Sequence, residues 1–348
     1  MTLRAMQAIF VALILCASSA RADDHETNHI EVADYLKLEQ VSDAQISPDG
    51  EQVIYARRYI DQMKDEWKSS IWIMEADGTR QRFLVDGSNA RWSPDGTRIL
   101  FLAADAHGKP QIFIRWMDAD CAISQVTRVR VTPSTPTLSP DGRSIAFVAI
   151  VPAKVECNID MPSPPEGAEW TKPPRVLDRL HYRQDRVGFR DPGYSHLFVV
   201  PAESGSARQL TEGEWHVGAQ FDGLFIGAGL SWTPDSKHII FDGYDSLDND
   251  LEYRRSHLYS IDAANGDKVQ LTSEEGYWAG PVVSPNGNSI AFLGYPATGN
   301  TYAMERLYVM DTDGGNNRLL TDAFERAPNN VLWDANIRGI LFRAEVEG

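Results

Sequence analysis

Short apolar segments alternate with turn-forming residues along most of the chain. A Ser-Pro-Asp-Gly turn, or a close variant, precedes an apolar run in five segments: 46–56, 92–102, 138–148, 232–242 and 283–293. A degenerate sixth copy occupies residues 332–344. Proline presets φ at the second turn position, the acidic residue can bond its own backbone, and glycine accepts the positive φ that often follows. Each copy therefore predicts a tight turn between two β-strands.

A second motif lies between the copies and consists of an apolar strand, a short polar turn and another strand. It occupies segments 70–85, 111–127, 196–211, 257–272 and 306–321. In the first of these, Ile71 and Ile73 alternate with Trp72 and Met74, so both faces of the strand are largely apolar. Strands that are apolar on both faces indicate a sheet covered on both sides.

The two motifs together predict four antiparallel strands in every 45–50 residues or so, which is typical of a β-propeller blade. The alternative, a β-sandwich with accidental turn similarity, is disfavoured by five good copies of two interleaved motifs. We therefore expect an all-β propeller in residues 41–348, with about five and a half blades in an incomplete or open ring. The expected blades are 41–86, 87–133, 134–226, 227–279, 280–328 and a partial 329–348.

The third blade is nearly twice as long as the others because it contains an insertion at 152–195. Its first part is rich in proline, and its second part is basic and aromatic, with Arg179, Arg183, Arg186 and Arg190. Insertions in one blade often lie on the working face of a repeat protein. Arg183 and Arg186 are therefore candidate substrate-binding residues, with a solvated hairpin as the alternative.

The fourth blade contains an unusually acidic segment, residues 244–259. Its spacing does not match the calcium-loop template, which needs alternating ligands, a glycine and a distal glutamate. We expect a solvated loop there, with no metal and no cofactor.

The first residues have the pattern of a secretory signal peptide. Residues 1–22 contain a basic start, a short apolar stretch and an Ala-Arg-Ala cleavage site, and a polar lead-in follows at 23–40. The stretch is too short to span a membrane comfortably, so we expect export to the periplasm or beyond. Export would permit a disulfide between Cys121 and Cys157, but the sequence leaves their pairing open. The net charge of −16 disfavours nucleic acid as a partner.

A search for catalytic motifs finds none that could run a reaction alone. The nearest matches to a Gly-x-Ser-x-Gly nucleophile elbow, residues 142–146 and 287–291, lack the last glycine and fall inside the repeat. Their serines, Ser144 and Ser289, open strands. We therefore expect no catalytic residue in this chain and no peptidase activity from it alone.

The strings "RWMDAD" and "DRLHYRQDRVGF", combined with the repeat, resemble the N-terminal propeller of prolyl-oligopeptidase-family serine peptidases. The resemblance is to the bacterial acylaminoacyl-peptidase and dipeptidyl-aminopeptidase branch. It implies a seven-bladed propeller that restricts substrates to short peptides and precedes an α/β-hydrolase domain. In the dipeptidyl-peptidase branch two adjacent glutamates hold the substrate amine, and Glu252 is the candidate here, although no second glutamate adjoins it.

Three hypotheses follow. In the first, the chain is the substrate-gating propeller portion of an exported serine peptidase, and its partners are a peptide substrate and a hydrolase domain. In the second, it is a stand-alone periplasmic propeller of the TolB type that binds a protein partner. In the third, it is a degraded gene product.

Overall fold

The computed structural model describes residues 30–118, 120–153, 162–171, 175–177, 180, 182–185, 187–203, 205–221, 224–226, 228–244, 254–300 and 302–346. The chain divides into two compact units, residues 1–40 with 58–68 and residues 41–57 with 69–348. In the first unit, the 3-10 helix η1 (Val32–Lys37) is capped by Glu31 and Asp34, and the side chain of Gln62 donates a hydrogen bond to the Leu36 carbonyl.

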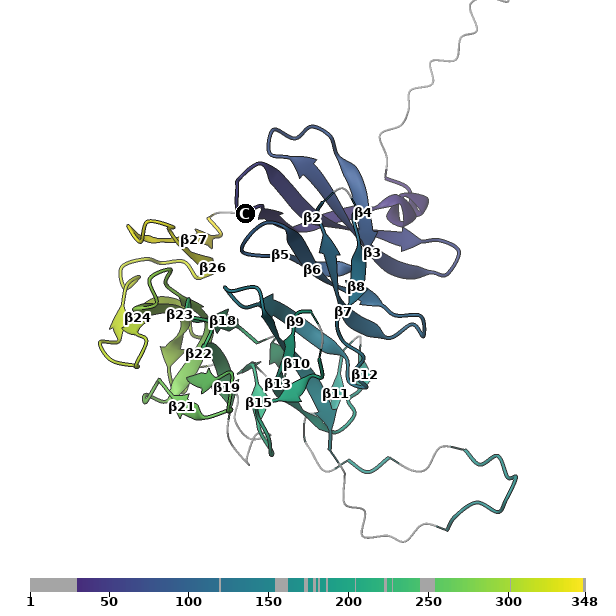
Figure 1. The fold of residues 1–348 in the computed structure, drawn as a ribbon. Coiled ribbons are helices and arrows are strands. Elements are labelled where there is room, and N and C mark those ends of the chain that lie inside the picture. Colours follow the sequence, from purple (N-terminus) through teal and green to yellow (C-terminus); the bar gives the residue numbers. More distant parts are fainter. Residues whose placement is uncertain are drawn as a thin grey trace, which may run out of the picture. The chain divides into compact units, whose positions relative to one another are not determined.

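Successive groups of strands form separate antiparallel sheets, four of which contain four strands (Figure 1). The first contains β1 (Glu39–Ile46), β2 (Gln52–Asp61), β3 (Glu66–Glu75) and β4 (Arg82–Asp86). The second contains β5 (Ser88–Trp92), β6 (Arg98–Ala104), β7 (Pro110–Trp116) and β8 (Ile123–Gln125). The third contains β9 (Pro133–Leu138), β10 (Ser144–Pro152), β13 (Gly193–Pro201) and β14 (Arg208–Gln209). In each of these three sheets, every strand pairs with the strand named before or after it.

The fourth sheet contains β18 (Leu230–Trp232), β19 (His238–Tyr244), β20 (His257–Asp262) and β21 (Lys268–Gln270), and β15 (His216–Val217) pairs with the far end of β19. The fifth contains β22 (Gly276–Val283), β23 (Ser289–Pro296), β24 (Arg306–Asp311) and β25 (Arg318–Leu319). A sixth sheet has two described strands, β26 (Pro328–Trp333) and β27 (Ile340–Ala344).

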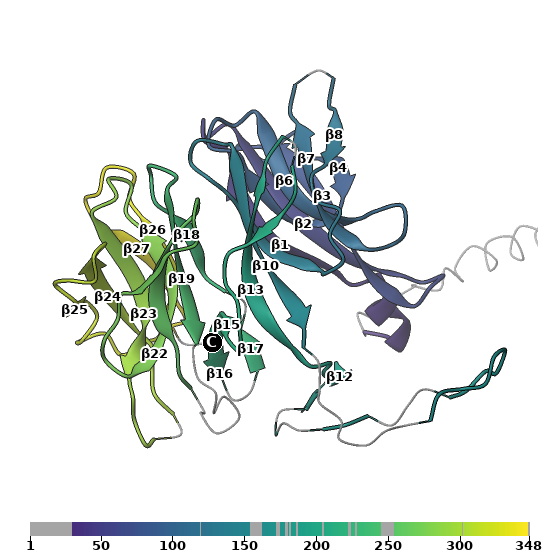
Figure 2. The same ribbon diagram turned by 60° about the horizontal axis from the view of Figure 1, so that its bottom comes forward.

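Two short hairpins stand outside these sheets. β11 (Arg183–Gln184) pairs with β12 (Gly188–Phe189) in the insertion of the third sheet. β16 (Ala219–Phe221) pairs with β17 (Leu224–Ile226), and β16 lies beside β19 and β22 (Figure 2). The fold predicted from the sequence, an all-β propeller with about five and a half four-stranded blades, is confirmed.

The repeated Ser-Pro-Asp-Gly turn is held by the same hydrogen bonds of the first residue's hydroxyl in each of the five complete copies. In the second sheet, Ser93 Oγ donates to Asp95 at 2.6 Å and accepts from the Arg98 N–H at 2.9 Å. The Gly96 N–H also donates to the Ser93 carbonyl at 2.9 Å. Ser139 repeats these contacts in the third sheet, and Thr233 repeats the two made by its hydroxyl in the fourth. The serine hydroxyl therefore connects the two strands of the hairpin.

In four of its five copies the second motif ends in a threonine, and this residue links the outer two strands. Thr211 Oγ1 lies 3.1 Å from His196 Nδ1 and accepts from the Leu197 N–H at 3.0 Å. Thr272 makes the equivalent contacts with His257 and Leu258. In the second sheet Gln111 takes the place of the histidine, and its side chain accepts from the Thr127 hydroxyl at 2.8 Å. A buried threonine therefore satisfies a strand N–H in each of these sheets.

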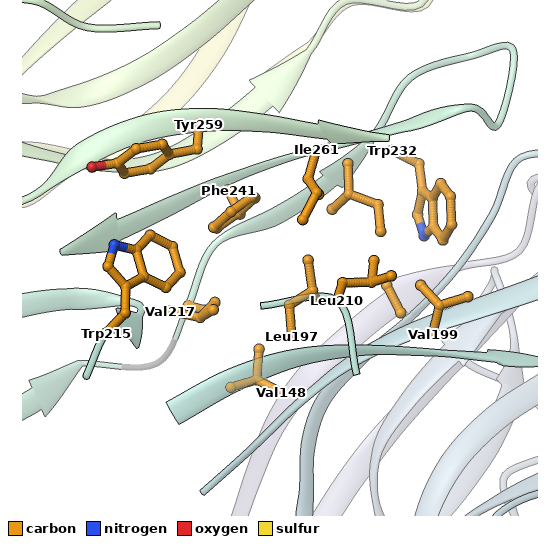
Figure 3. Close-up of a cluster of buried hydrophobic side chains, with 13 residues drawn as sticks. Val148, Leu197, Val199, Leu210, Trp215, Val217, Trp232, Phe241, Tyr259 and Ile261 are labelled. Carbon is orange, nitrogen blue, oxygen red and sulfur yellow. The ribbon is translucent and has the colours of Figure 1, made fainter. Parts of the chain in front are cut away.

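Each sheet is covered by its neighbours because its strands alternate apolar side chains between two faces. On β10, Phe147 lies in a cluster with the second sheet, whereas Val148 lies in a cluster with the fourth. On β19, Phe241 faces the third sheet and Ile240 the fifth. Figure 3 shows the cluster between the third and fourth sheets, with Trp215 packed near Phe241.

Burial of each such large apolar side chain is worth about 1.5–3 kcal/mol. Similar clusters join the first sheet to the second and the fifth to the sixth. The consecutive sheets of the larger unit therefore form one continuous series of face-to-face contacts.

Candidate functional site

The candidate site lies where the chain enters β20 and meets the first residues of β22. Ser256 is fully buried, and its Oγ donates to the Trp278 carbonyl at 2.7 Å and accepts the Trp278 N–H at 3.0 Å. The Ser256 N–H donates to the Gly276 carbonyl at 3.0 Å. Arg255 forms a 2.8 Å ion pair with Glu275. These contacts fix the end of the acidic segment of the fourth sheet against the fifth sheet.

A stacked pair of tyrosines lies next to this attachment. Tyr277 on β22 and Tyr295 on β23 are cross-strand partners, with ring centroids 5.4 Å apart and an interplanar angle of 21°. Both rings are mostly buried, with 3% and 8% exposure. Arg254 Nη1 donates to the Tyr295 hydroxyl at 3.3 Å. The guanidinium of Arg254 is thereby held beside an aromatic pair.

Glycines opposite these aromatic residues allow the close approach. A Cβ on Gly294 would lie 2.0 Å from the Tyr277 carbonyl oxygen and 2.6 Å from the Trp278 ring. No side chain fits at that distance, so the sequence at this position must be glycine for β22 and β23 to pair as they do.

Two carboxylates complete the cluster. Asp242, 1% exposed, accepts the Gly229 N–H at 3.1 Å and the Gly280 N–H at 2.9 Å, and so joins the fourth sheet to the fifth. Burial raises the pKa of Asp242 to about 7, against the lowering effect of those two N–H groups. Burial also raises the pKa of Glu305, while the charge of Arg254 opposes that shift.

The hydroxyl of Tyr277 is affected by both carboxylates. Burial is the largest cause of its raised pKa, followed by the charges of Glu305 and then Asp242. The cluster of Asp242, Arg254, Tyr277, Tyr295 and Glu305 is called the blade 4–5 polar cluster below. It combines a cationic donor, carboxylate acceptors and two mostly buried aromatic rings. Groups of these kinds bind the carbonyls, N–H groups and side chains of peptides.

The buried histidines near these strands have structural roles. His196 and His257 both contact a threonine of the outer strand, as described above, and burial lowers the pKa of each. His257 Nε2 also lies 3.7 Å from a Glu275 oxygen. Ser144 and Ser289 open β10 and β23, in agreement with the sequence analysis. Among the described residues, no group of three or more His, Cys, Asp or Glu side chains could hold a metal ion.

Of the three predicted substrate-binding residues, the structure describes one. Arg183 is exposed on β11, where it is the strand partner of Phe189. Phe189 stacks on Tyr182, with centroids 6.0 Å apart, and lies 5.0 Å from the Arg175 guanidinium carbon. Arg186 and Glu252 lie outside the described residues. Glu252 is two positions before Arg254 in the sequence. Its substrate-binding role remains a prediction.

Cys121 is exposed and free, and Cys157 lies outside the described residues. The predicted leader, residues 1–22, also lies outside them. No helix in the part of the chain that the structure describes is long and apolar enough to cross a membrane.

Sequence reasoning missed the blade 4–5 polar cluster, although the repeat contained one signal for it. Asp242 stands at the end of the repeated segment, where the other complete copies carry Ala56, Leu102, Val148 and Leu293. A carboxylate at a repeat position that is apolar in the other copies indicates a buried polar group with hydrogen-bond partners. Tyr277, Tyr295 and Glu305 gave no comparable signal, because their proximity depends on the pairing of sheets.

Comparisons with known proteins agree with this architecture. Residues 169–293 match the family described as "Dipeptidyl peptidase IV (DPP IV) N-terminal region". Dipeptidyl-peptidase 5 of Porphyromonas gingivalis is 22% identical over 347 residues, which cover 96% of this chain and 49% of the relative. The chain spans at most about half the length of the curated relatives it matches.

Solved structures show the same fold. The uncomplexed acylaminoacyl peptidase of Pyrococcus horikoshii aligns with a TM-score of 0.64 at 16% identity, covering 89% of this chain and 43% of that one. The β-propeller domain of the Trilobed protease from Pyrococcus furiosus, which has an open velcro topology, aligns with a TM-score of 0.57 at 15% identity, covering 90% of this chain and 79% of that one.

The chain is thus a β-propeller of four-stranded antiparallel blades. Residues 169–293 are similar to the N-terminal region of dipeptidyl peptidase IV, and most of the chain is similar to part of a dipeptidyl-peptidase.

Proposed function

We propose that this chain is the substrate-gating propeller portion of an exported serine peptidase that acts on short peptides. The observation that carries the proposal is the alignment of nearly the whole chain with about half the length of a dipeptidyl-peptidase. The blade 4–5 polar cluster supports it, because its donors, acceptors and aromatic rings suit a peptide backbone. In this proposal the chain binds and admits peptides, and the nucleophile belongs to a hydrolase domain.

Export is part of the proposal and rests on the leader pattern at residues 1–22. The peptide partner and the hydrolase domain are inferred from the relatives, whose names describe peptidases. A stand-alone propeller of the TolB type remains the alternative, and it would bind a folded protein partner in preference to short peptides.

The proposal predicts peptide binding without turnover. The full chain should bind an unmodified tripeptide such as Ala-Phe-Ala in a calorimetric titration and should release no product from a dipeptidyl p-nitroanilide. Arg254→Met should weaken tripeptide binding about tenfold, because a hydrogen bond to a charged donor contributes about 1.5–3 kcal/mol. Arg130→Met, at an exposed position away from the cluster, serves as the matched control.

Three results would count against the proposal. The first is tripeptide binding that Arg254→Met leaves unchanged. The second is the absence of binding by a chain shown to be folded by circular dichroism. The third is p-nitroanilide turnover that a serine-directed inhibitor abolishes, since this chain would then hold its own nucleophile.

A further inference from the structure

A cleft of about 470 Å³ opens between the turns of the fourth and fifth sheets. The β18–β19 turn contributes Thr233 and Asp235, the β22–β23 turn contributes Asn286, and the β24–β25 turn contributes Asp313. Its remaining walls include His238 and the apolar side chain of Ile240. These turns are at the opposite strand ends from the blade 4–5 polar cluster, so the cleft is a separate feature of the same two sheets.

The chain itself shows what fills the corresponding position between the second and third sheets. Arg98, the first residue of β6, extends its guanidinium to the carbonyl of Gly142 in the next turn, with an Nη2–O distance of 3.3 Å. The fit is tight, since a Cβ on Gly142 would lie 2.9 Å from the same nitrogen. An internal arginine therefore closes that inter-sheet position.

Between the fourth and fifth sheets the equivalent residue is His238, the first residue of β19, and the equivalent glycine is Gly287. Imidazole is shorter than an arginine side chain. Within the described residues, no hydrogen bond joins the His238 ring to the next turn. A Cβ on Gly287 would have only Pro234 as a near neighbour, at 3.3 Å. Where the second sheet has Arg98, the fourth sheet has the shorter His238, and the cleft is open at that position.

The groups around the cleft are mainly hydrogen-bond acceptors. Asp235 and Asp313 supply carboxylates, Ser260 and Thr312 supply hydroxyls, and Asn286 supplies an amide. The hydrogen bond from Thr233 is the largest cause of the lowered pKa of Asp235, which is therefore ionised at neutral pH. Lys237 and His238 are the nearby basic groups, and the charges of both act on Asp235. The whole chain carries a net charge of −16, which also favours a cationic ligand.

We propose that this cleft binds the arginine side chain of a peptide or partner polypeptide. A planar guanidinium offers five N–H donors, which suit acceptors arranged on three different turns. Its aliphatic stem can lie against Ile240 and Pro234. The guanidinium of the bound arginine, which belongs to another chain, takes the place that the Arg98 guanidinium takes between the second and third sheets. The inference does not depend on the proposed peptidase function.

The test uses three blocked tripeptides that differ in one side chain, Ac-Gly-Xaa-Gly-NH₂ with Xaa as arginine, lysine or citrulline. Calorimetric titration of the full chain should show the arginine peptide binding about tenfold tighter than citrulline, its neutral isostere, because charge-assisted hydrogen bonds are the stronger ones. Lysine should bind more weakly than arginine because it presents a compact ammonium.

Two variants locate the binding. Asp313→Asn should weaken the arginine peptide about fivefold through loss of a charge, while the amide oxygen can still accept the Gly315 N–H. Asp77→Asn is the matched control, because Asp77 has the same place in the corresponding turn of the first sheet and accepts the Thr79 N–H there. His238→Arg should fill the cleft with an internal guanidinium and abolish binding.

Equal binding of the arginine and citrulline peptides would overturn the proposal. Equal effects of Asp313→Asn and Asp77→Asn would overturn it as well. These outcomes can be read even where His238→Arg fails to fold, because the peptide comparison uses the unaltered chain.

Discussion

Asp242 illustrates at the scale of one residue how position in the fold sets chemistry. It belongs to a repeated segment in which the other complete copies end in apolar residues, and it is almost wholly buried between two sheets. Its carboxyl accepts N–H groups from both sheets, but burial dominates and raises its pKa. The proton on this group is therefore coupled to folding.

The pH dependence of stability should reveal this coupling. An aspartate with a folded pKa of about 7 and an ordinary unfolded value binds more protons when folded. Its contribution to stability is therefore fully present at low pH and falls as the pH rises from about 4 to about 7. The limiting slope is about 1.4 kcal/mol per pH unit.

The measurement compares the unaltered chain with Asp242→Asn by urea unfolding between pH 4.5 and 7.5. The stability of the unaltered chain relative to the variant should fall as the pH rises. Both proteins keep His196 and His257, so the effects of those groups largely cancel. Asp120→Asn at an exposed position is the control and should change little with pH. A constant difference between the unaltered chain and Asp242→Asn would show that Asp242 has an ordinary pKa.

At the scale of an element, the recurrent turn is a hydrogen-bonded unit in which the first residue matters most. Ser139 is fully buried, donates to Asp141 and accepts the Ser144 N–H. The proline and glycine set the backbone path, and the hydroxyl satisfies groups that would otherwise be buried without partners. This explains why the first position is serine or threonine in all five complete copies.

Ser139→Ala should therefore destabilise the chain by about 1–3 kcal/mol, the cost of leaving a buried N–H without an acceptor. Chemical denaturation would measure the change, with Ser273→Ala at an exposed position as the control. Equal stability of the two variants would mean that the turn is held by its backbone alone. Peptide binding should not change in Ser139→Ala, because Ser139 is neither in the blade 4–5 polar cluster nor in the lining of the cleft beside His238.

At the scale of the whole molecule, the chain is a series of sheets that depend on one another for burial. Each inner strand divides its apolar side chains between two clusters, as Phe147 and Val148 do on β10. No single sheet covers both of its faces alone. Short loops and strand ends then carry the groups that can bind ligands. The blade 4–5 polar cluster and the cleft beside His238 both lie at such positions.

Export is a prediction about the whole molecule, because it sets the compartment in which the chain meets its peptides. Signal-peptide cleavage after Ala22 should leave a protein that begins at Asp23. Expression with the native leader in a Gram-negative host, followed by N-terminal sequencing of the periplasmic fraction, would measure this. Recovery of the chain only in the cytoplasm, with Met1 to Ala22 intact, would contradict the prediction.

The sequence alone determined the architecture, because each blade of a propeller repeats the same local pattern of turn residues and apolar strands. Turn residues at fixed spacing and strands with two apolar faces are properties of consecutive residues, so the number of blades follows from the sequence. The resemblance to peptidase propellers rests on the same local strings. Even the structural role of Ser144 followed from its place in the repeat.

Only the tertiary structure decided which residues meet. Arg254, Tyr277, Tyr295 and Glu305 come from separate segments, and they lie together because β22 and β23 pair and the fourth sheet packs on the fifth. The cleft beside His238 likewise exists only because a neighbouring turn faces it. Periodicity along a chain predicts which face of a strand is buried, but the identity of its partner across a sheet interface depends on long-range packing.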